Sequence, residues 1–212
     1  MSASRSTAAI AFVDLAGFSA ATDVYGDELA LKMLGVFEQI VRDALGGEAP
    51  LKWIGDEVML AFDDGAGALA VLGELLNRCR EEPRIPLTRT GLHAGPVLRR
   101  GDDMFGSTVN IAAQLTAMAR PGELLTTRPC ADLARTSGID VEDRGEQQVR
   151  SVAEPIHVYA IALARAADPQ WIDPVCKMHA PLQAYRRAPG QRWFCSPVCA
   201  EAYARNPEAY PD

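Results

Sequence analysis

Two short apolar runs, each meeting an aspartate beside a glycine turn, set the strongest limits on how this chain folds. Residues 8–14, AAIAFVD, have the pattern of a buried strand that ends on Asp14, and Gly17 then permits a tight turn into a helix. Residues 51–62, LKWIGDEVMLAF, hold two apolar runs separated by a Gly-Asp turn, which is typical of a β-hairpin that exposes Asp56. If the strands pair, both aspartates meet at one edge of a sheet.

The remaining patterns follow an order that predicts the fold class. Apolar residues recur at helical spacing over residues 27–45, and two glycines end the run. The other expected elements are helices at residues 66–80 and 107–119, a strand pair over 87–98 and a final strand over 155–163. This order predicts an α+β sandwich in which helices pack mainly on one face of a single sheet.

A short polar segment divides the chain into two units. Residues 164–170, ARAADPQ, have the small and polar composition of a linker between domains. They separate a main domain, residues 8–163, from a second unit, residues 171–212, which is too short to bury a large core unaided. Residues 1–7 are an N-terminal tail.

Composition argues against several classes of function. The chain has 212 residues, 48% of them hydrophobic, so it is expected to fold, and its net charge of −7 disfavours nucleic-acid binding. No window approaches the roughly 18 apolar residues that cross a bilayer, so we expect no membrane insertion and a cytoplasmic protein. The five cysteines form an odd set, which suits metal ligation in a reducing compartment better than disulfide bonds.

The two turn aspartates have two interpretations from the residues alone. Carboxylate oxygens are the ligands that Mg²⁺ or Mn²⁺ prefers, and such ions keep positions open for the oxygens of a triphosphate. The other interpretation is that Asp14 and Asp56 are solvated turn residues without a shared ligand.

Four sequence blocks resemble a known family, and the resemblance favours the first interpretation. They are FVDLAGFS at residues 12–19, LKWIGDEVMLAF at 51–62, FGSTVNIAAQL at 105–115 and DRGEQQVRSVAEPIHVYAI at 143–161. In content, order and spacing the blocks resemble the class III nucleotidyl cyclases, the adenylyl and guanylyl cyclase catalytic domain. The resemblance runs over residues 8–163 and implies a ferredoxin-like sandwich with one mainly antiparallel sheet.

The resemblance also implies which residues hold the triphosphate. Asp14 and Asp56 match the family's metal-binding aspartates, which hold two Mg²⁺ or Mn²⁺ ions in each active site. The matching phosphate cradle consists of the backbone of Leu15, Ala16, Gly17, Phe18 and Ser19. Free N–H groups at a helix start favour an anionic phosphate, which agrees with this placement.

Two charged residues match the positions at which adenylyl cyclases read the purine base. Lys52 falls at the position of a purine-reading lysine, and Asp103 falls at the position of its partner. A cation beside a carboxylate complements the acceptor and donor edge of adenine, so the resemblance implies ATP rather than GTP. If the loop shifts by one residue, Asp102 is the partner instead.

The last block of matches concerns the ribose and the phosphates. Asn110 matches the asparagine that orients the ribose, and Arg150 stands where relatives have a phosphate-binding lysine. Arginine keeps the positive charge of that lysine but changes its geometry.

One position departs from the family pattern. Four residues after Asn110 the family has an arginine that stabilises charge in the transition state, and this chain has Gln114. Arginines in phosphoryl transfer contribute on the order of 10³ to 10⁵ in rate, so an uncompensated loss predicts a slow enzyme. The arginines that could substitute are Arg99, Arg100 and Arg120.

Three functional hypotheses follow. The first is an adenylate cyclase that converts ATP to 3′,5′-cyclic AMP and pyrophosphate for signal transduction. In this family the metal aspartates come from one subunit and the base- and ribose-binding residues from the other, so the resemblance implies a homodimer. The second is a nucleotide-binding pseudo-cyclase that acts as a regulatory subunit, because of Gln114. The third is a metal module on a dimerisation scaffold.

The second unit resembles a different family. DPVCKM at residues 173–178, WFCSPVC at 193–199 and NPEAYPD at 206–212 resemble the YHS domain, a small metal-binding module related to TRASH-type zinc ribbons. Members usually have glycine where this chain has Lys177.

The cysteines of this unit are candidate metal ligands. The thiolates of Cys176, Cys195 and Cys199 suit Zn²⁺ or copper, and a small module needs such a staple. Structural zinc takes four ligands, and His179 is either the fourth ligand or a solvent-facing ring.

Overall fold

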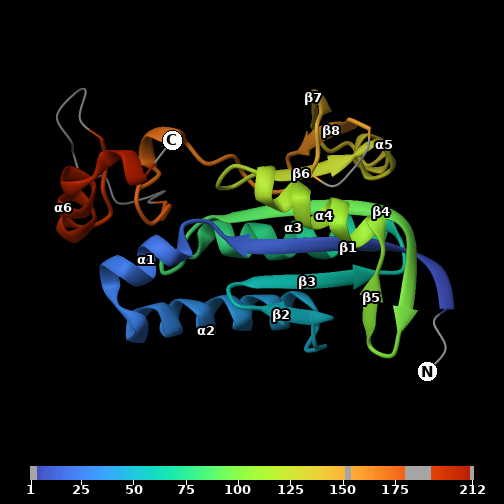
Figure 1. The fold of residues 1–212 in the computed structure, drawn as a ribbon, viewed down its shortest axis with the longest axis horizontal. Helices are drawn as coiled ribbons and strands as arrows, with labels where there is room; N and C mark the ends of the chain where they lie inside the picture. Colours follow the sequence, from blue (N-terminus) through green and yellow to red (C-terminus); the bar gives the residue numbers. More distant parts are fainter. Residues whose placement is uncertain (1–3, 151–153, 180–191, 211–212) are drawn as a thin grey trace.

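The computed structural model describes residues 4–150, 154–179 and 192–210 (Figure 1). Its centre is an 8-stranded sheet in the order β2-β3-β1-β4-β6-β8-β7, with β5 added beside β4. The strands are β1 (Ser4–Leu15), β2 (Lys52–Ile54), β3 (Glu57–Phe62), β4 (Thr88–Arg100), β5 (Asp103–Phe105), β6 (Leu124–Thr127), β7 (Val141–Gln147) and β8 (Ile156–Ile161). The β4–β6 pair is parallel and the other strand pairs are antiparallel, so the sheet is mixed.

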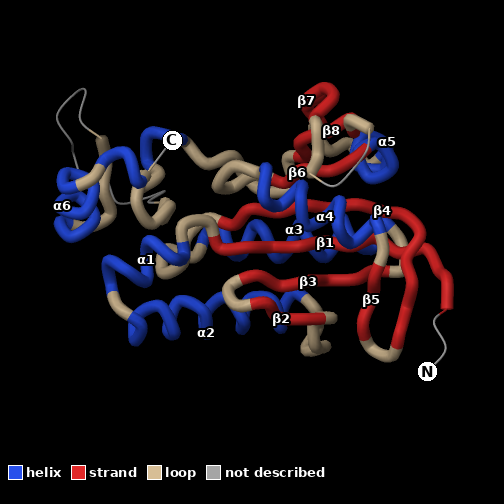
Figure 2. The backbone as a smooth tube through the Cα atoms, viewed as in Figure 1, coloured by secondary structure: helices blue, strands red, loops and turns tan. Residues whose placement is uncertain are grey.

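Helices cover both faces of this sheet. They are α1 (Phe18–Tyr25), α2 (Asp27–Ala44), α3 (Gly65–Glu81), α4 (Ser107–Met118), α5 (Arg128–Thr136) and α6 (Pro197–Arg205), with single turns η1 (Pro169–Trp171) and η2 (Pro207–Ala209). Alternate residues of β1 divide between two cores: Val13 packs with α2 and α3, whereas Phe12 packs on the side of α4. Helices were expected mainly on one face of the sheet. Helix α4 lies on the face opposite to α2 and α3 (Figure 2).

The expected helices are confirmed to within a few residues, but the expected strand pair over residues 87–98 is wrong. A single strand, β4, runs through this region and pairs with β1 along its length. Its glycines are not turn residues. A methyl group built on Gly95 would lie 2.7 Å from Thr108 Oγ1, and one on Gly91 would overlap the backbone of α4. Glycine is required because α4 approaches β4 closely.

The second unit, residues 171–212, is called the C-terminal unit below. Its described residues pack beside α1 (Figure 1). Buried residues Val175, Cys176 and Cys199 belong to the same hydrophobic cluster as α2 and α3. The predicted zinc-ribbon-like fold is not confirmed, because the described part of this unit has one short bridge, Ile172 with His179, and the helices η1, α6 and η2. Residues 180–191 lie outside the described residues. None of the described helices combines the length and apolar character that a membrane crossing requires.

Candidate nucleotide and metal sites

Three carboxylates gather at the end of β1, and we call them the acidic site: Asp14, Asp56 and Glu57. Asp14 lies near the end of β1 and pairs in register with Glu57, the first residue of β3. Asp56 lies in the turn just before, where Gly55 has a φ of 65°. The carboxylate of Asp14 accepts hydrogen bonds from Nε of Arg89, at 3.0 Å, and from its Nη2. The predicted convergence of the two aspartates is therefore accompanied by an acid and a cation that the sequence did not single out.

The electrostatics of the acidic site show a surplus of negative charge. Burial, followed by the charges of Asp14 and Asp56, raises the pKa of Glu57 to about 7. Burial and then the Asp14 carboxylate also raise the pKa of Asp56, while Arg89 acts in the opposite direction. The neighbouring carboxylates of Asp14 and Asp56 are oxygen donors whose mutual repulsion a bound cation relieves, so this pair fits Mg²⁺ or Mn²⁺.

The predicted phosphate cradle, residues 15–19, forms the turn between β1 and α1. Gly17 adopts a left-handed conformation, φ 73° and ψ 18°, directly before the first residue of α1. The first N–H groups of a helix lack partners within it, and these amides begin at Phe18 and Ser19. The amide of Ala16 is already used, because it donates to the Leu87 carbonyl at 2.8 Å. The helix start, rather than the whole segment, is the part suited to phosphate.

Lys52 and Asp103 form an ion pair, with 2.8 Å between Nζ and Oδ2. They are 51 residues apart in sequence, on β2 and β5, and the hydrogen bond from Lys52 lowers the pKa of Asp103. Lys52 pairs in register with Met59, whose side chain packs in the core beneath α4. Lys52, Asp14 and Glu57 therefore share one face of the sheet. Between the two alternatives, the lysine contacts Asp103 and not Asp102.

The other predicted site residues lie on α4 and after β7. Asn110 is exposed and Gln114 is half-buried, and their spacing of four residues places them on one side of α4. Arg150 is exposed in the turn that follows β7. Arg120 follows α4 and lines a cavity of about 590 Å³ under β6, β7 and α3.

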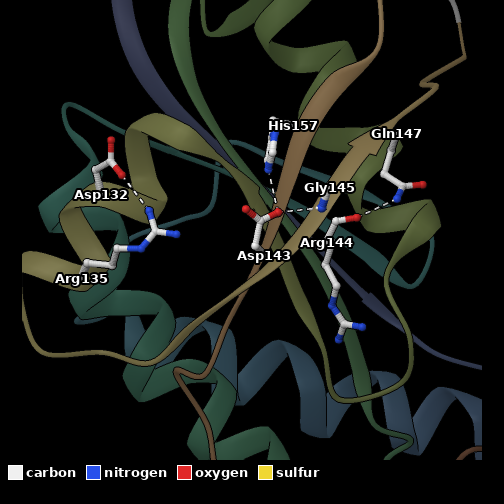
Figure 3. A network of polar contacts seen from close by, with 7 residues as sticks. All are labelled: Asp132, Arg135, Asp143, Arg144, Gly145, Gln147 and His157. Carbon is white, nitrogen blue, oxygen red and sulfur yellow. Dashed lines mark hydrogen bonds and ion pairs between the residues drawn. The ribbon is translucent and has the colours of Figure 1, made fainter.

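A polar network fixes the strand that precedes Arg150 (Figure 3). Asp143 Oδ1 accepts hydrogen bonds from the Gly145 amide at 2.7 Å and lies 2.6 Å from Nε2 of His157. These contacts lower the pKa of Asp143, the Gly145 amide being the larger cause. The pairing of β7 with β8 shifts register between Asp143 and Glu146, and Gln147 donates to the Arg144 carbonyl at 2.9 Å. His157 thus has a structural role at a β-bulge.

The C-terminal unit contains a second group of possible metal ligands. Ligand atoms of Asp173, Cys176, Cys195 and Cys199 all lie within 4.8 Å of one another. We call the three cysteines the thiol cluster. The Sγ atoms of Cys176 and Cys195 are 3.4 Å apart, and those of Cys195 and Cys199 are 3.8 Å apart. Hydrogen bonds from the other two thiols lower the pKa of Cys199. The three sulfurs fit a thiophilic cation such as Zn²⁺ or Cu⁺.

Asp173 and His179 differ in their relation to the thiol cluster. The Asp173 carboxylate is fully buried and accepts from the amides of Val175 at 2.8 Å and Cys195 at 2.6 Å, so it holds the two cysteine-bearing loops together. His179 does not join the cluster, because its Nδ1 lies 2.7 Å from Arg80 Nη1. Burial, and then the charge of Arg80, lower the pKa of His179 to about 4.

Lys177 lies at the position where the YHS resemblance predicts glycine, and its backbone is left-handed. Its φ of 54° is the one positive value among the described non-glycine residues. Its Nζ donates to the Pro174 carbonyl at 2.9 Å. Left-handed backbone favours glycine, and this hydrogen bond offsets part of the cost for lysine.

Carboxylates at a sheet edge beside a helix start are the features of a domain that binds a polyphosphate through divalent cations. A family model for the adenylate and guanylate cyclase catalytic domain matches residues 2–162, and the chain belongs to this family. Among curated relatives, a pH-sensitive adenylate cyclase of Mycobacterium tuberculosis is 29% identical over 160 residues, 72% of this chain and 40% of its own length. An adenylate cyclase of Streptomyces coelicolor is 34% identical over 60% of this chain and 34% of its own length. The chain therefore spans less than half of these relatives.

Solved structures agree with the fold. An adenylate/guanylate cyclase/hydrolase from Silicibacter pomeroyi superposes with a TM-score of 0.60 at 26% identity, covering 74% of this chain and 97% of that one. The adenylyl cyclase CyaB of P. aeruginosa gives a TM-score of 0.64 at 20% identity, with 76% and 96% covered. These matches support the class III cyclase form of the sheet and its helices.

Proposed function

We propose that this chain is an adenylate cyclase, which converts ATP into 3′,5′-cyclic AMP and pyrophosphate at a site shared by two copies. The observation that carries the proposal is the ion pair of Lys52 with Asp103, because the resemblance places the adenine-reading pair at these residues. Relatives named adenylate cyclase support the same activity.

The residues divide the chemistry between binding and charge stabilisation. Asp14 and Asp56 would hold two Mg²⁺ or Mn²⁺ ions, which would supply positive charge at the ribose 3′-hydroxyl and the phosphates. The start of α1, at Phe18 and Ser19, binds phosphate oxygens. Arg89 keeps the Asp14 carboxylate in place by hydrogen bonds.

The reaction itself is a single displacement. The 3′-oxygen forms a bond to the α-phosphorus and loses its proton to solvent, while the bond from that phosphorus to the α,β-bridging oxygen breaks and pyrophosphate leaves. Asn110 orients the ribose, and Arg150 binds a phosphate. No covalent intermediate with the protein is required.

A homodimer completes the site, with the acidic site from one copy and Lys52, Asp103 and Asn110 from the other. Exposed apolar side chains near the ion pair support an interface there: Ile54, Leu98 and Phe105 are 47%, 40% and 47% exposed. Each isologous dimer then holds two equivalent sites.

Gln114 decides how fast the reaction is. Glutamine donates a hydrogen bond but carries no charge, so this position stabilises the transition state less than an arginine does. Replacing Gln114 by Arg is expected to raise cyclic AMP formation by on the order of 10³-fold if no other group serves. No gain would mean that another arginine already serves.

The C-terminal unit is proposed to be a YHS-like module that binds Zn²⁺ or copper through the thiol cluster. The buried sulfurs of Cys176 and Cys199 and the 3.4 Å separation of Cys176 and Cys195 support such a site. Its first expected effect is to stabilise a unit with little core of its own.

The test of the proposed activity is an assay of the full chain with Mn-ATP and, separately, with Mn-GTP. We expect cyclic AMP from ATP and a lower rate with GTP. A folded, dimeric chain that binds ATP but forms no cyclic AMP would contradict the proposal and leave a nucleotide-binding regulatory subunit as the function.

A further inference from the structure

The helix α1 touches the C-terminal unit at both of its ends. Its start follows Gly17, and its last residue is Tyr25. Eight residues of helix span roughly 12 Å, so one short element joins the two contacts.

The first contact lies at the start of α1, beside residues 15–19, which we call the phosphate turn. A methyl group built on Gly17 would lie 2.9 Å from Lys177 Cγ and 3.2 Å from the Val175 carbonyl oxygen. The segment that carries Cys176 therefore packs directly on the turn that begins α1. Glycine is needed here both for its φ of 73° and for this close approach.

A backbone relay connects the same two segments. The amide of Leu87 donates to the Lys177 carbonyl at 3.1 Å, and the Leu87 carbonyl accepts from the Ala16 amide at 2.8 Å. Leu87 is buried, 3% exposed, so water competes little for these bonds. The residue after Cys176 is thus two hydrogen bonds from the phosphate turn.

The second contact lies at the other end of α1. The Tyr25 hydroxyl is 2.9 Å from Cys195 Sγ, 3.1 Å from Cys199 Sγ and 2.8 Å from Ser196 Oγ. These residues are at least 170 positions away in sequence. A phenol from the cyclase domain therefore completes the polar surroundings of the thiol cluster.

A bound cation changes the hydrogen bonding of the Tyr25 hydroxyl. Thiolates that ligate a metal have lost their protons and can only accept hydrogen bonds, so Tyr25 donates its single O–H hydrogen to one of them. Hydrogen bonds to a charged acceptor are stronger than neutral ones. Metal binding therefore strengthens the contact between α1 and the thiol cluster.

We infer that Tyr25 is a positioning residue through which a thiophilic cation, Zn²⁺ or Cu⁺, in the thiol cluster orders α1 and the phosphate turn. The inference rests on the metal site of the proposed function but does not require catalysis. Because linkage is reciprocal, zinc tightens the binding of Mn-ATP by the same factor by which Mn-ATP tightens the binding of zinc. The factor is expected to be about 5 or more.

The test uses the full chain and zinc alone, with Tyr25→Phe as the variant. In the wild type, zinc should slow amide hydrogen exchange over residues 15–25. Tyr25→Phe should still bind one zinc ion, with an affinity about 10- to 100-fold lower, as expected for loss of a hydrogen bond to a metal ligand. In that variant zinc should slow exchange over residues 15–25 less than in the wild type, and the coupling to Mn-ATP should weaken, while the contact at Gly17 and the Leu87 relay remain.

Two controls make the outcome decisive. Tyr203→Phe changes a tyrosine of α6 that packs on Phe194 and Tyr210, so it should behave as the wild type does. Cys199→Ser should lose zinc binding itself. The inference is overturned if zinc protects residues 15–25 equally in Tyr25→Phe, or if the wild type binds no zinc. A chain that forms no cyclic AMP but shows this protection would contradict only the proposed activity.

Discussion

The acidic site and the thiol cluster are two candidate cation sites in one chain, and they differ in how much each depends on other molecules. The acidic site offers oxygen donors, is partly open, and supplies only part of the ligands that a divalent ion needs. The thiol cluster offers sulfur donors, two of them fully buried, and all three come from one chain. The first geometry suits an ion that arrives with substrate, and the second suits an ion that stays.

The largest expected effect separates the two sites. Asp14→Asn should lower cyclic AMP formation by on the order of 10³-fold, since it removes a metal ligand and several kcal/mol of charge stabilisation. Spectra of Co²⁺ bound to the thiol cluster should not change. Asp43→Asn, an exposed change on α2, should leave both readouts unaltered. A cobalt spectrum that changes in Asp14→Asn would show that the sites are not separate.

Next in size is the stabilisation that metal gives the C-terminal unit. At a free zinc concentration 100 times the dissociation constant, the wild type should gain about 2.7 kcal/mol in the free energy of unfolding. Cys199→Ser should lose this increment, whereas Cys79→Ala, a change at a buried residue of α3, should keep it although its own stability falls. Urea titrations with and without zinc measure each increment. Equal increments in the wild type and Cys199→Ser would exclude the thiol cluster as the zinc site.

A smaller effect measures the contact between the two units. Gly17→Ala should cost about 1 kcal/mol or more beyond Gly138→Ala, because overpacking adds to the strain that both share. The two glycines have φ values of 73° and 74°, and a methyl group on Gly138 meets nothing within 4 Å. Thermal unfolding gives both values. Equal losses would mean that residues 175–177 do not pack on the phosphate turn in solution.

A further effect concerns pH and the acidic site. Glu57 has a pKa raised from 4.5 to about 7, so the metal-free folded chain binds more protons than the unfolded chain between these values. Stability should therefore fall as pH rises from about 4.5 to about 7, and Glu57→Gln should flatten this part of the profile. Glu74→Gln, an exposed residue of α3, should not. An unchanged profile in Glu57→Gln would contradict the assigned cause.

The sequence predicts the elements better than it predicts the contacts between them. The helix expected at residues 27–45 is observed at Asp27–Ala44, because apolar periodicity reports which side of a helix is buried. The expected strand pair over residues 87–98 is wrong, since the region is one strand whose Gly91 and Gly95 allow the close approach of α4. Glycine has two uses, and a single sequence does not separate them.

The candidate sites show the same division. The pairing of Lys52 with Asp103 was predicted from the family resemblance, because composition alone does not indicate which residues pair. Arg89 was missed because it lies 75 residues from Asp14, and Tyr25 because it lies 170 or more from its sulfur partners. Glu57 stands next to Asp56, so adjacency to a predicted ligand was the signal that could have found it. Residues that are far apart in sequence contact each other at no fixed separation, so a single sequence does not reveal such contacts.

The relay at Leu87 has a consequence for how such a two-part chain can diverge. Both of its hydrogen bonds use main-chain atoms, so other apolar side chains that fit this buried position preserve them. Proline is the exception, because it has no amide hydrogen to give to Lys177. The joint between the two units can thus persist in relatives whose residues here have drifted apart, and a comparison of side-chain identities would overlook it.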